Sequence, residues 1–125
     1  MTVLIDSWAW IEYWKGGRYS EDVGSYIEGD EEAVVSTINL TEVYYWILRF
    51  YDGKIAEQKR ALIEKRCYII PVEVSIAVLA AKIKRELRLA LADSLILATA
   101  RQSGAKLVTG DPDFKQLKEA FFIGV

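Results

Sequence analysis

The sequence predicts an α/β fold, a three-layer α/β/α sandwich with a central parallel sheet of four to five strands. Short apolar runs without polar alternation recur along the chain, as expected for strands that are buried on both faces. Segments with helical periodicity separate these runs, and that alternation is typical of parallel strands joined by right-handed crossovers. The 125 residues suit one domain, residues 1–125, which is long enough to bury a core.

The expected strands are the short apolar runs, each bounded by a turn residue or by a polar residue that can start a helix. The first is Val3-Leu4-Ile5, which Asp6 follows directly. Further runs of this kind occupy residues 33–37, 68–70 and 106–109, and residues 121–123 are the candidate for a last strand.

The expected helices fill the segments between these strands. The first two are predicted over residues 6–15 and 20–27, separated by the helix-ending pair Gly16-Gly17. Either Asn39 or Thr41 can cap the third helix, which runs to residue 50 before Asp52-Gly53 breaks it. The remaining helices are predicted over residues 54–66, 74–87, 93–102 and 114–120.

The composition excludes several kinds of enzyme. The chain has no histidine, so Cys–His catalysis, Ser–His–Asp catalysis and histidine-ligated zinc are ruled out. Cys67 is the only cysteine, which prevents an intrachain disulfide and fits a reducing compartment. The N-terminus lacks the pattern of a signal peptide, and no apolar stretch is long enough to cross a bilayer. We therefore expect a cytoplasmic protein.

Four acidic residues are expected at one edge of the sheet. Asp6 follows the first strand, and Asp111 follows the strand at residues 106–109 after a single glycine. Glu42 lies in the first turn of the helix after the second strand, and Asp93 opens the helix that precedes the fourth. Ligands of open parallel sheets bind beyond the carboxyl ends of the strands. The four acids therefore predict a single site.

Clustered carboxylates repel one another, and their pKa values rise unless cations join them. Mg²⁺ and Mn²⁺ prefer oxygen ligands and can activate water for attack on a phosphodiester. Because histidine is absent, metal-activated water is the expected nucleophile. The four acids are thus the candidate metal ligands and catalytic residues, while Asp113 and Thr109 are candidates for the outer part of the site.

Each acid also has a local structural explanation. Asp6, Asp93 and Asp113 are suited to N-caps, and a glutamate in a first turn, as at Glu42, complements the helix dipole. Asp111 precedes a proline, as in many turns. Taken singly, these explanations are the simpler ones. It is the shared edge of the sheet that indicates a metal site.

Four motifs, in this order and spacing, resemble those of the PIN-domain ribonucleases. The motifs are Asp6-Ser7-Trp8-Ala9-Trp10-Ile11, Thr41-Glu42-Val43, the segment Ala92-Asp93-Ser94-Leu95-Ile96-Leu97-Ala98-Thr99-Ala100, and Leu107-Val108-Thr109-Gly110-Asp111-Pro112-Asp113-Phe114. The resemblance covers essentially the whole chain, and the small size is similar to that of VapC-type toxins. Two departures are the bulk of Trp8 and Trp10 and the sequence Gly110-Asp111-Pro112, which lacks the basic neighbour commonly found beside the last aspartate.

The resemblance implies a Mg²⁺- or Mn²⁺-dependent endoribonuclease that hydrolyses RNA phosphodiester bonds. Asp6 and Asp93 would be its surest metal ligands, and Glu42 and Asp111 would complete the site. A homodimer and inhibition by a small VapB-type antitoxin are also implied. The alternative is a catalytically inactive PIN-like interaction module, which Mn²⁺ would not stabilise.

Two other enzyme classes fit less well. A phosphoacceptor receiver domain has a similar sheet but needs an aspartate where Ser36-Thr37 stands. A phosphatase with a nucleophilic aspartate at Asp6 would need another acid two residues later, where the chain has Trp8.

The net charge of −2 is unfavourable for binding phosphates, so local basic surfaces matter. Lys84, Arg85 and Arg88, together with Lys82, lie on or just after the helix at residues 74–87 and are candidate RNA contacts. A solvated helix face explains them equally well. The aromatic run that includes Tyr44-Tyr45-Trp46 covers more than one helix face. Its exposed rings could stack on unpaired bases, but a surface for a partner or a second copy is the favoured interpretation.

Overall fold

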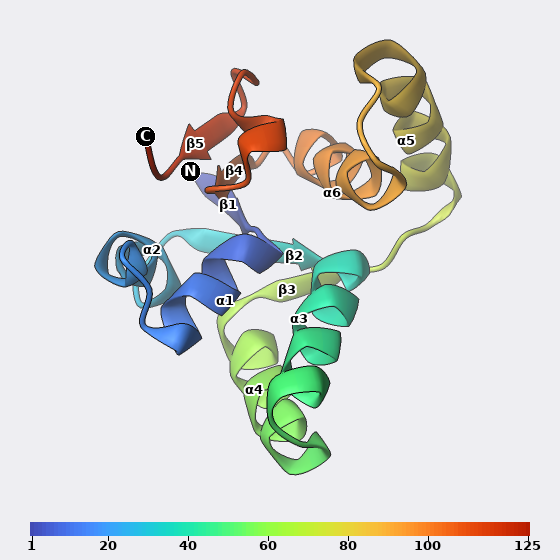
Figure 1. Ribbon diagram of the computed structural model, residues 1–125. Helices are drawn as coiled ribbons and strands as arrows, with labels where there is room; N and C mark the ends of the chain where they lie inside the picture. Colours follow the sequence, from blue (N-terminus) through green and yellow to red (C-terminus); the bar gives the residue numbers. More distant parts are fainter.

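A parallel sheet of five strands runs through the protein, which a computed structural model describes over residues 1–125 (Figure 1). The strand order is β3-β2-β1-β4-β5, and all four pairings are parallel. The strands are β1 (Thr2–Ile5), β2 (Glu32–Ser36), β3 (Tyr68–Ile70), β4 (Lys106–Thr109) and β5 (Ala120–Phe122). The predicted three-layer α/β/α fold is therefore confirmed.

Six α-helices cover the two faces of the sheet. They are α1 (Ser7–Lys15), α2 (Ser20–Ile27), α3 (Thr37–Phe50), α4 (Gly53–Arg66), α5 (Val74–Leu87) and α6 (Leu91–Gln102). Successive residues of β1 point to opposite faces, as the pleat requires. Val3 and Ile5 pack with residues of α1 to α4, whereas Leu4 packs with residues of α5 and α6. The core is thus divided by the sheet into two apolar clusters.

The C-terminal segment differs from the prediction. Residues 114–120 do not form a helix, because only a 3-10 turn, η1 (Pro112–Phe114), is present, and β5 begins at Ala120. The amide of Leu107 donates to the carbonyl oxygen of Glu119 at 2.9 Å, and the amide of Ile123 donates to that of Thr109 at 2.8 Å. Pairing with β4 therefore satisfies this backbone in place of a helix.

Two helices begin earlier than predicted. The helix α3 starts at Thr37, which was expected in a strand, and its cap is Ser36 rather than Asn39 or Thr41. Ser36 and Asn39 form a capping box. The Ser36 hydroxyl accepts from backbone amides of the first turn, and the Asn39 side chain accepts from the backbone amide of Ser36. The helix α6 begins at Leu91, so Asp93 lies in its first turn and does not cap it. No helix has the length and apolar character needed to cross a membrane.

Arg66, the last residue of α4, joins this helix to the end of α2 and the loop before β2. Its guanidinium donates to the carbonyl oxygens of Tyr26, Ile27 and Glu31 at 2.8 to 2.9 Å. The side chain of Arg66 is 19% exposed, and its three hydrogen bonds are partly buried. The three hydrogen bonds therefore hold the end of α4 against the end of α2 and the loop before β2.

We expect Arg66→Met to lower the free energy of unfolding by roughly 2–4 kcal/mol, because three carbonyl oxygens lose a charged hydrogen-bond donor. The methionine side chain keeps the packing of the aliphatic part of the arginine. Urea denaturation measures the change. Arg60→Met on the same helix is the control, since its ion pairs with Glu57 and Glu64 are exposed and should contribute far less. Equal losses in the two variants would contradict this account.

Candidate metal centre

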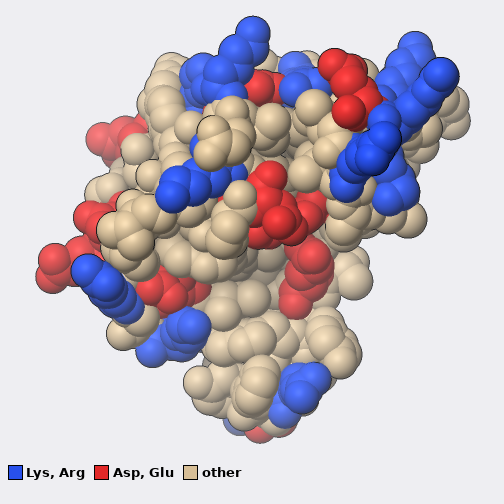
Figure 2. All heavy atoms as spheres, turned by 45° about the horizontal axis from the view of Figure 1, so that its top comes forward, with Lys and Arg blue, Asp and Glu red and all other residues tan.

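The structure brings the predicted acidic residues together at the carboxyl edge of the sheet. Asp6 stands between β1 and α1, Glu42 lies on α3, and Asp93 lies on α6. Asp111 and Asp113 belong to the turn after β4. In Figure 2 acidic side chains gather near the centre of one face.

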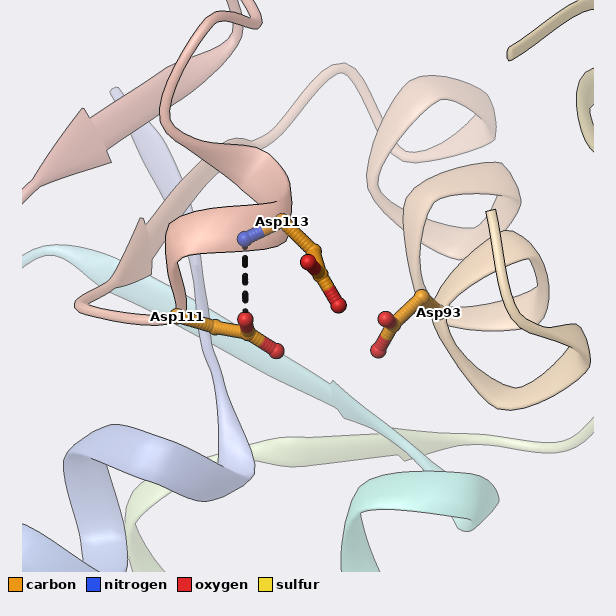
Figure 3. A group of neighbouring side chains, drawn as sticks. All are labelled: Asp93, Asp111 and Asp113. Atoms are coloured by element: carbon orange, nitrogen blue, oxygen red, sulfur yellow. Dashed lines mark hydrogen bonds between the residues drawn. The ribbon is translucent and has the colours of Figure 1, made fainter. Parts of the chain in front are cut away.

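Three of these carboxylates form the tightest group. Asp93, Asp111 and Asp113 each offer an oxygen atom, and these atoms lie within 4.8 Å of one another. Figure 3 shows Asp93 on its helix facing the two aspartates of the turn. The amide of Asp113 donates to Oδ1 of Asp111 at 3.0 Å, so the turn explanation also holds for Asp111. Asp113, which the sequence places at the outer part of the site, is therefore next to Asp93 and Asp111.

Asp6 is buried and held by hydrogen bonds. Asp6 is 3% exposed and occupies the N-cap position of α1, but its side chain makes no capping hydrogen bond, so capping does not explain the carboxylate. Thr109 Oγ1 donates to Oδ2 of Asp6 at 2.7 Å, and Asn39 Nδ2 approaches Oδ1 at 3.2 Å. Thr109 also accepts a hydrogen bond from the amide of Asp111 at 3.0 Å. Its hydroxyl thus links β1 directly to the turn that carries Asp111.

Ser7 and Asn39, which the sequence does not predict as site residues, join Asp6 to Glu42. Asn39 Nδ2 donates to Ser7 Oγ at 2.9 Å, and Ser7 Oγ donates to Oε1 of Glu42 at 2.6 Å. The amide oxygen of Asn39 accepts from the backbone of Ser36 at 2.8 Å, which fixes the orientation of its amide group. The spacing Ser36-x-x-Asn39 of the capping box was the signal that could have revealed this residue.

Burial and mutual repulsion disfavour the charged forms of two acids. Desolvation raises the pKa of Asp6 from 3.8 to about 7, with smaller contributions from Glu42 and Asp111, although the hydrogen bond from Thr109 opposes the rise. Desolvation also raises the pKa of Asp93 to about 6, and Asp111, Asp113 and Glu42 add to the effect. Folding therefore assembles negative charges that a cation would stabilise.

The donor set suits a hard divalent cation. All of its ligand atoms are carboxylate oxygens, and the chain has no histidine that would favour zinc. Two segments supply the ligand atoms. Asp93 lies on α6, and Asp111 and Asp113 lie in the turn that follows β4. The residues present therefore fit Mg²⁺ or Mn²⁺.

The indole of Trp8 packs against Gly110, the residue before Asp111. A Cβ atom at Gly110 would lie 2.4 Å from Cζ2 of Trp8 and 2.7 Å from the carbonyl oxygen of Ile123. Glycine is thus required here because the indole occupies the space of a side chain. The bulk of Trp8, a departure from the resemblance, is accommodated by this glycine.

The predicted basic residues lie at the end of α5. Lys84, Arg85 and Arg88 are all exposed, and none forms an ion pair with the acidic residues. Figure 2 shows basic side chains at the right of the face that displays the acidic group. Arg88 ends the helix with φ of 58°, the only positive φ among residues other than glycine.

A family model for the PIN domain matches residues 3–120. The chain belongs to the PIN-domain family. Comparison with curated proteins found no significant match.

Several solved structures share the fold. A toxin–antitoxin complex from Klebsiella pneumoniae is 23% identical, with 97% of this chain and 99% of that chain covered and a TM-score of 0.79. VapC20 of Mycobacterium tuberculosis, a sarcin–ricin loop cleaving toxin, is 16% identical over 98% of both chains, with a TM-score of 0.75. VapBC-1 from nontypeable Haemophilus influenzae is 15% identical over 98% of this chain and 97% of that chain, with a TM-score of 0.77.

The raised pKa of Asp6 predicts that the metal-free protein becomes less stable as the pH rises. Between about pH 4 and pH 7 the folded state keeps a proton on Asp6 that the unfolded state releases. The contribution of Asp6 to the free energy of unfolding therefore falls as pH rises through this window. In Asp6→Asn this loss is absent, so the variant should gain stability relative to the parent by up to a few kcal/mol at pH 7.

Urea denaturation of both proteins in a chelator, at several pH values, measures this difference. A difference in free energy that stays constant from pH 4 to pH 8 would show that Asp6 is ionised normally in the fold.

Proposed function

We propose that this PIN-domain protein is a Mg²⁺- or Mn²⁺-dependent endoribonuclease that hydrolyses RNA phosphodiester bonds. The convergence of Asp93, Asp111 and Asp113 beside the buried Asp6 and the linked Glu42 carries the proposal. Assembling these acids raises the pKa values of Asp6 and Asp93, a cost that a bound cation would offset. The absence of histidine supports a mechanism based on carboxylates and a metal.

Asp93, Asp111 and Asp6 would hold the cation, with Asp113 and Glu42 able to complete its surroundings. The bound ion would lower the pKa of a water molecule and offset charge that develops on the phosphate. Thr109 and Asn39 keep the Asp6 carboxylate in one orientation, because each of its oxygens accepts a hydrogen bond. Oε1 of Glu42 accepts from Ser7, which leaves Oε2 to accept a proton from the attacking water.

Lys84, Arg85 and Arg88 would contact RNA phosphates on the α5 side of the acidic group. They are exposed and free of acidic partners, so ion pairs within the protein do not compete with this role. Phosphate contacts of this kind would position the RNA without reading its sequence.

We further propose that the protein acts in the cytoplasm as the toxin of a pair, as a homodimer held inactive by a VapB-type antitoxin. The Klebsiella pneumoniae neighbour is a toxin–antitoxin complex, which supports a partner of this kind for the present fold. Tyr45, Leu48, Phe50 and Tyr51 expose apolar surface at the end of α3, which is costly unless another chain covers it.

Replacing one ligand should abolish cleavage without unfolding the protein. We expect Asp93→Asn and Asp6→Asn to reduce the rate of RNA cleavage with Mn²⁺ at least about 100-fold, because the charge that holds the cation is removed. Cleavage of labelled RNA measures the rate, and circular dichroism checks the fold. Asp30→Asn, an exposed substitution before β2 and hence at the opposite edge of the sheet, should cleave like the parent.

Normal cleavage by either variant would contradict the metal site. Absence of RNA cleavage in the parent protein, together with unchanged thermal stability in Mn²⁺, would instead favour the catalytically inactive interaction module.

Arg88 offers a test of the basic surface that preserves the backbone. Its left-handed conformation is tolerated by asparagine, so Arg88→Asn removes the charge with little strain. Introduced into the inactive Asp93→Asn protein, Arg88→Asn should weaken RNA binding. The slope of log K against log salt concentration should become shallower by about 0.7, as expected for one lost phosphate contact. Lys54→Gln on α4 should change neither quantity, and equal effects at both positions would contradict the assignment.

A further inference from the structure

Trp8, Tyr19 and Arg18 form a group of neighbouring side chains near the acidic group, which we call the aromatic ridge. The rings of Trp8 and Tyr19 have centroids 6.2 Å apart, and the guanidinium of Arg18 lies 5.3 Å from the centroid of the Tyr19 ring. Trp8 and Tyr19 are half-buried and Arg18 is exposed. The three residues therefore present π surface and one positive charge to the solvent.

The ridge begins directly at the candidate metal centre. Trp8 lies two residues after Asp6, and its indole packs against Gly110, the residue before Asp111. Helical side chains lean toward the N-terminus of their helix, which for α1 is the edge that carries the acids. A nucleotide whose phosphate reached Asp111 would thus have Trp8 within reach of its base.

Core packing does not fully explain the ridge. Trp8 packs against the core cluster that contains Ile5 and Trp10, but it is only half-buried, so part of it remains accessible to a ligand. Tyr19 is anchored by its backbone amide, which donates to Glu12 Oε2 at 2.8 Å, so its ring is held in place without using its hydroxyl group.

We propose that the aromatic ridge stacks an unpaired RNA base next to the phosphate that is cleaved, while Arg18 contacts the RNA backbone. The inference rests on the proposed ribonuclease function and assigns to these three residues a subsite for one unpaired base. Bases in a duplex are already stacked on one another, whereas unpaired bases can stack on aromatic rings and be approached by an arginine. The basic end of α5 would hold the RNA on the other side of the acidic group.

The test is RNA binding by the inactive Asp93→Asn protein, measured by fluorescence anisotropy with Mn²⁺. The probes are a labelled single-stranded oligonucleotide, the same strand in a duplex, and strands in which one base at a time is removed. We expect Trp8→Leu and Tyr19→Leu each to weaken single-strand binding on the order of 10-fold and to leave duplex binding unchanged. Removing the stacked base should weaken binding to the parent but not to these variants.

Controls separate stacking from packing. Trp8→Phe and Tyr19→Phe keep an aromatic ring and should retain most of the affinity. Trp14→Leu removes a tryptophan at the far end of α1, where it packs against Trp10 and Lys59, and should not change RNA binding. Should Trp8→Leu melt at a much lower temperature, Tyr19→Leu decides the question, because the atoms nearest to Gly110 belong to Trp8 and Ile123.

Unchanged single-strand affinity in Tyr19→Leu, equal weakening in Trp14→Leu, or no RNA binding by the parent would each overturn the inference. Cleavage by the catalytically intact protein is measured separately. If the intact protein cleaves RNA but the ridge variants bind RNA normally, the proposed function stands and the proposed stacking on the aromatic ridge is wrong. If binding depends on the ridge but nothing is cleaved, the ridge stands and the ribonuclease proposal fails.

Discussion

The hydrogen bonds of the buried Asp6 carboxylate tie together segments that are distant in sequence. Thr109 at the end of β4 donates to one of its oxygens, and Asn39 of α3 approaches the other. The same threonine accepts from the amide of Asp111, and the same asparagine reaches Ser7 and, through it, Glu42. The positions of Asp111 and Glu42 therefore depend on how Asp6 is held.

This arrangement has a cost that is informative about function. A carboxylate that is 3% exposed loses most of its hydration, and the neighbouring acids repel it. Optimising stability alone would favour a neutral side chain at this position. The polar network around Asp6 therefore favours a role that needs its charge, and the proposed binding of a divalent cation is such a role.

The alternation of apolar runs and helical segments was sufficient to predict the sheet and the layers. It was sufficient because both faces of each strand are buried, which local sequence reveals directly. The helix predicted at residues 114–120 failed because the backbone there pairs with β4, a choice made by tertiary contact. The cap of α3 was misplaced because Ser36 had been assigned to the preceding strand.

The acidic residues of the site could also be found from the sequence, since the ends of parallel strands meet at one edge. The spacing Ser36-x-x-Asn39 offered a signal for the cap of α3, but the hydrogen bond from Asn39 to Ser7 could not be predicted, because these residues are 32 positions apart. Asp113 was placed at the outer part of the site because a turn leaves the direction of its side chain open. The contact between Trp8 and Gly110 likewise depends on the pairing of β1 with β4.

The central claim is that these carboxylates form one cation site whose protons a metal displaces. Calorimetric titration with Mn²⁺ in buffers of different ionisation enthalpy counts those protons. Because the pKa values of Asp6 and Asp93 are raised to about 7 and about 6, binding at pH 6 should release about one proton or more. At pH 8 the release should approach zero. Absence of Mn²⁺ binding, or binding at pH 6 without proton release, would contradict the account.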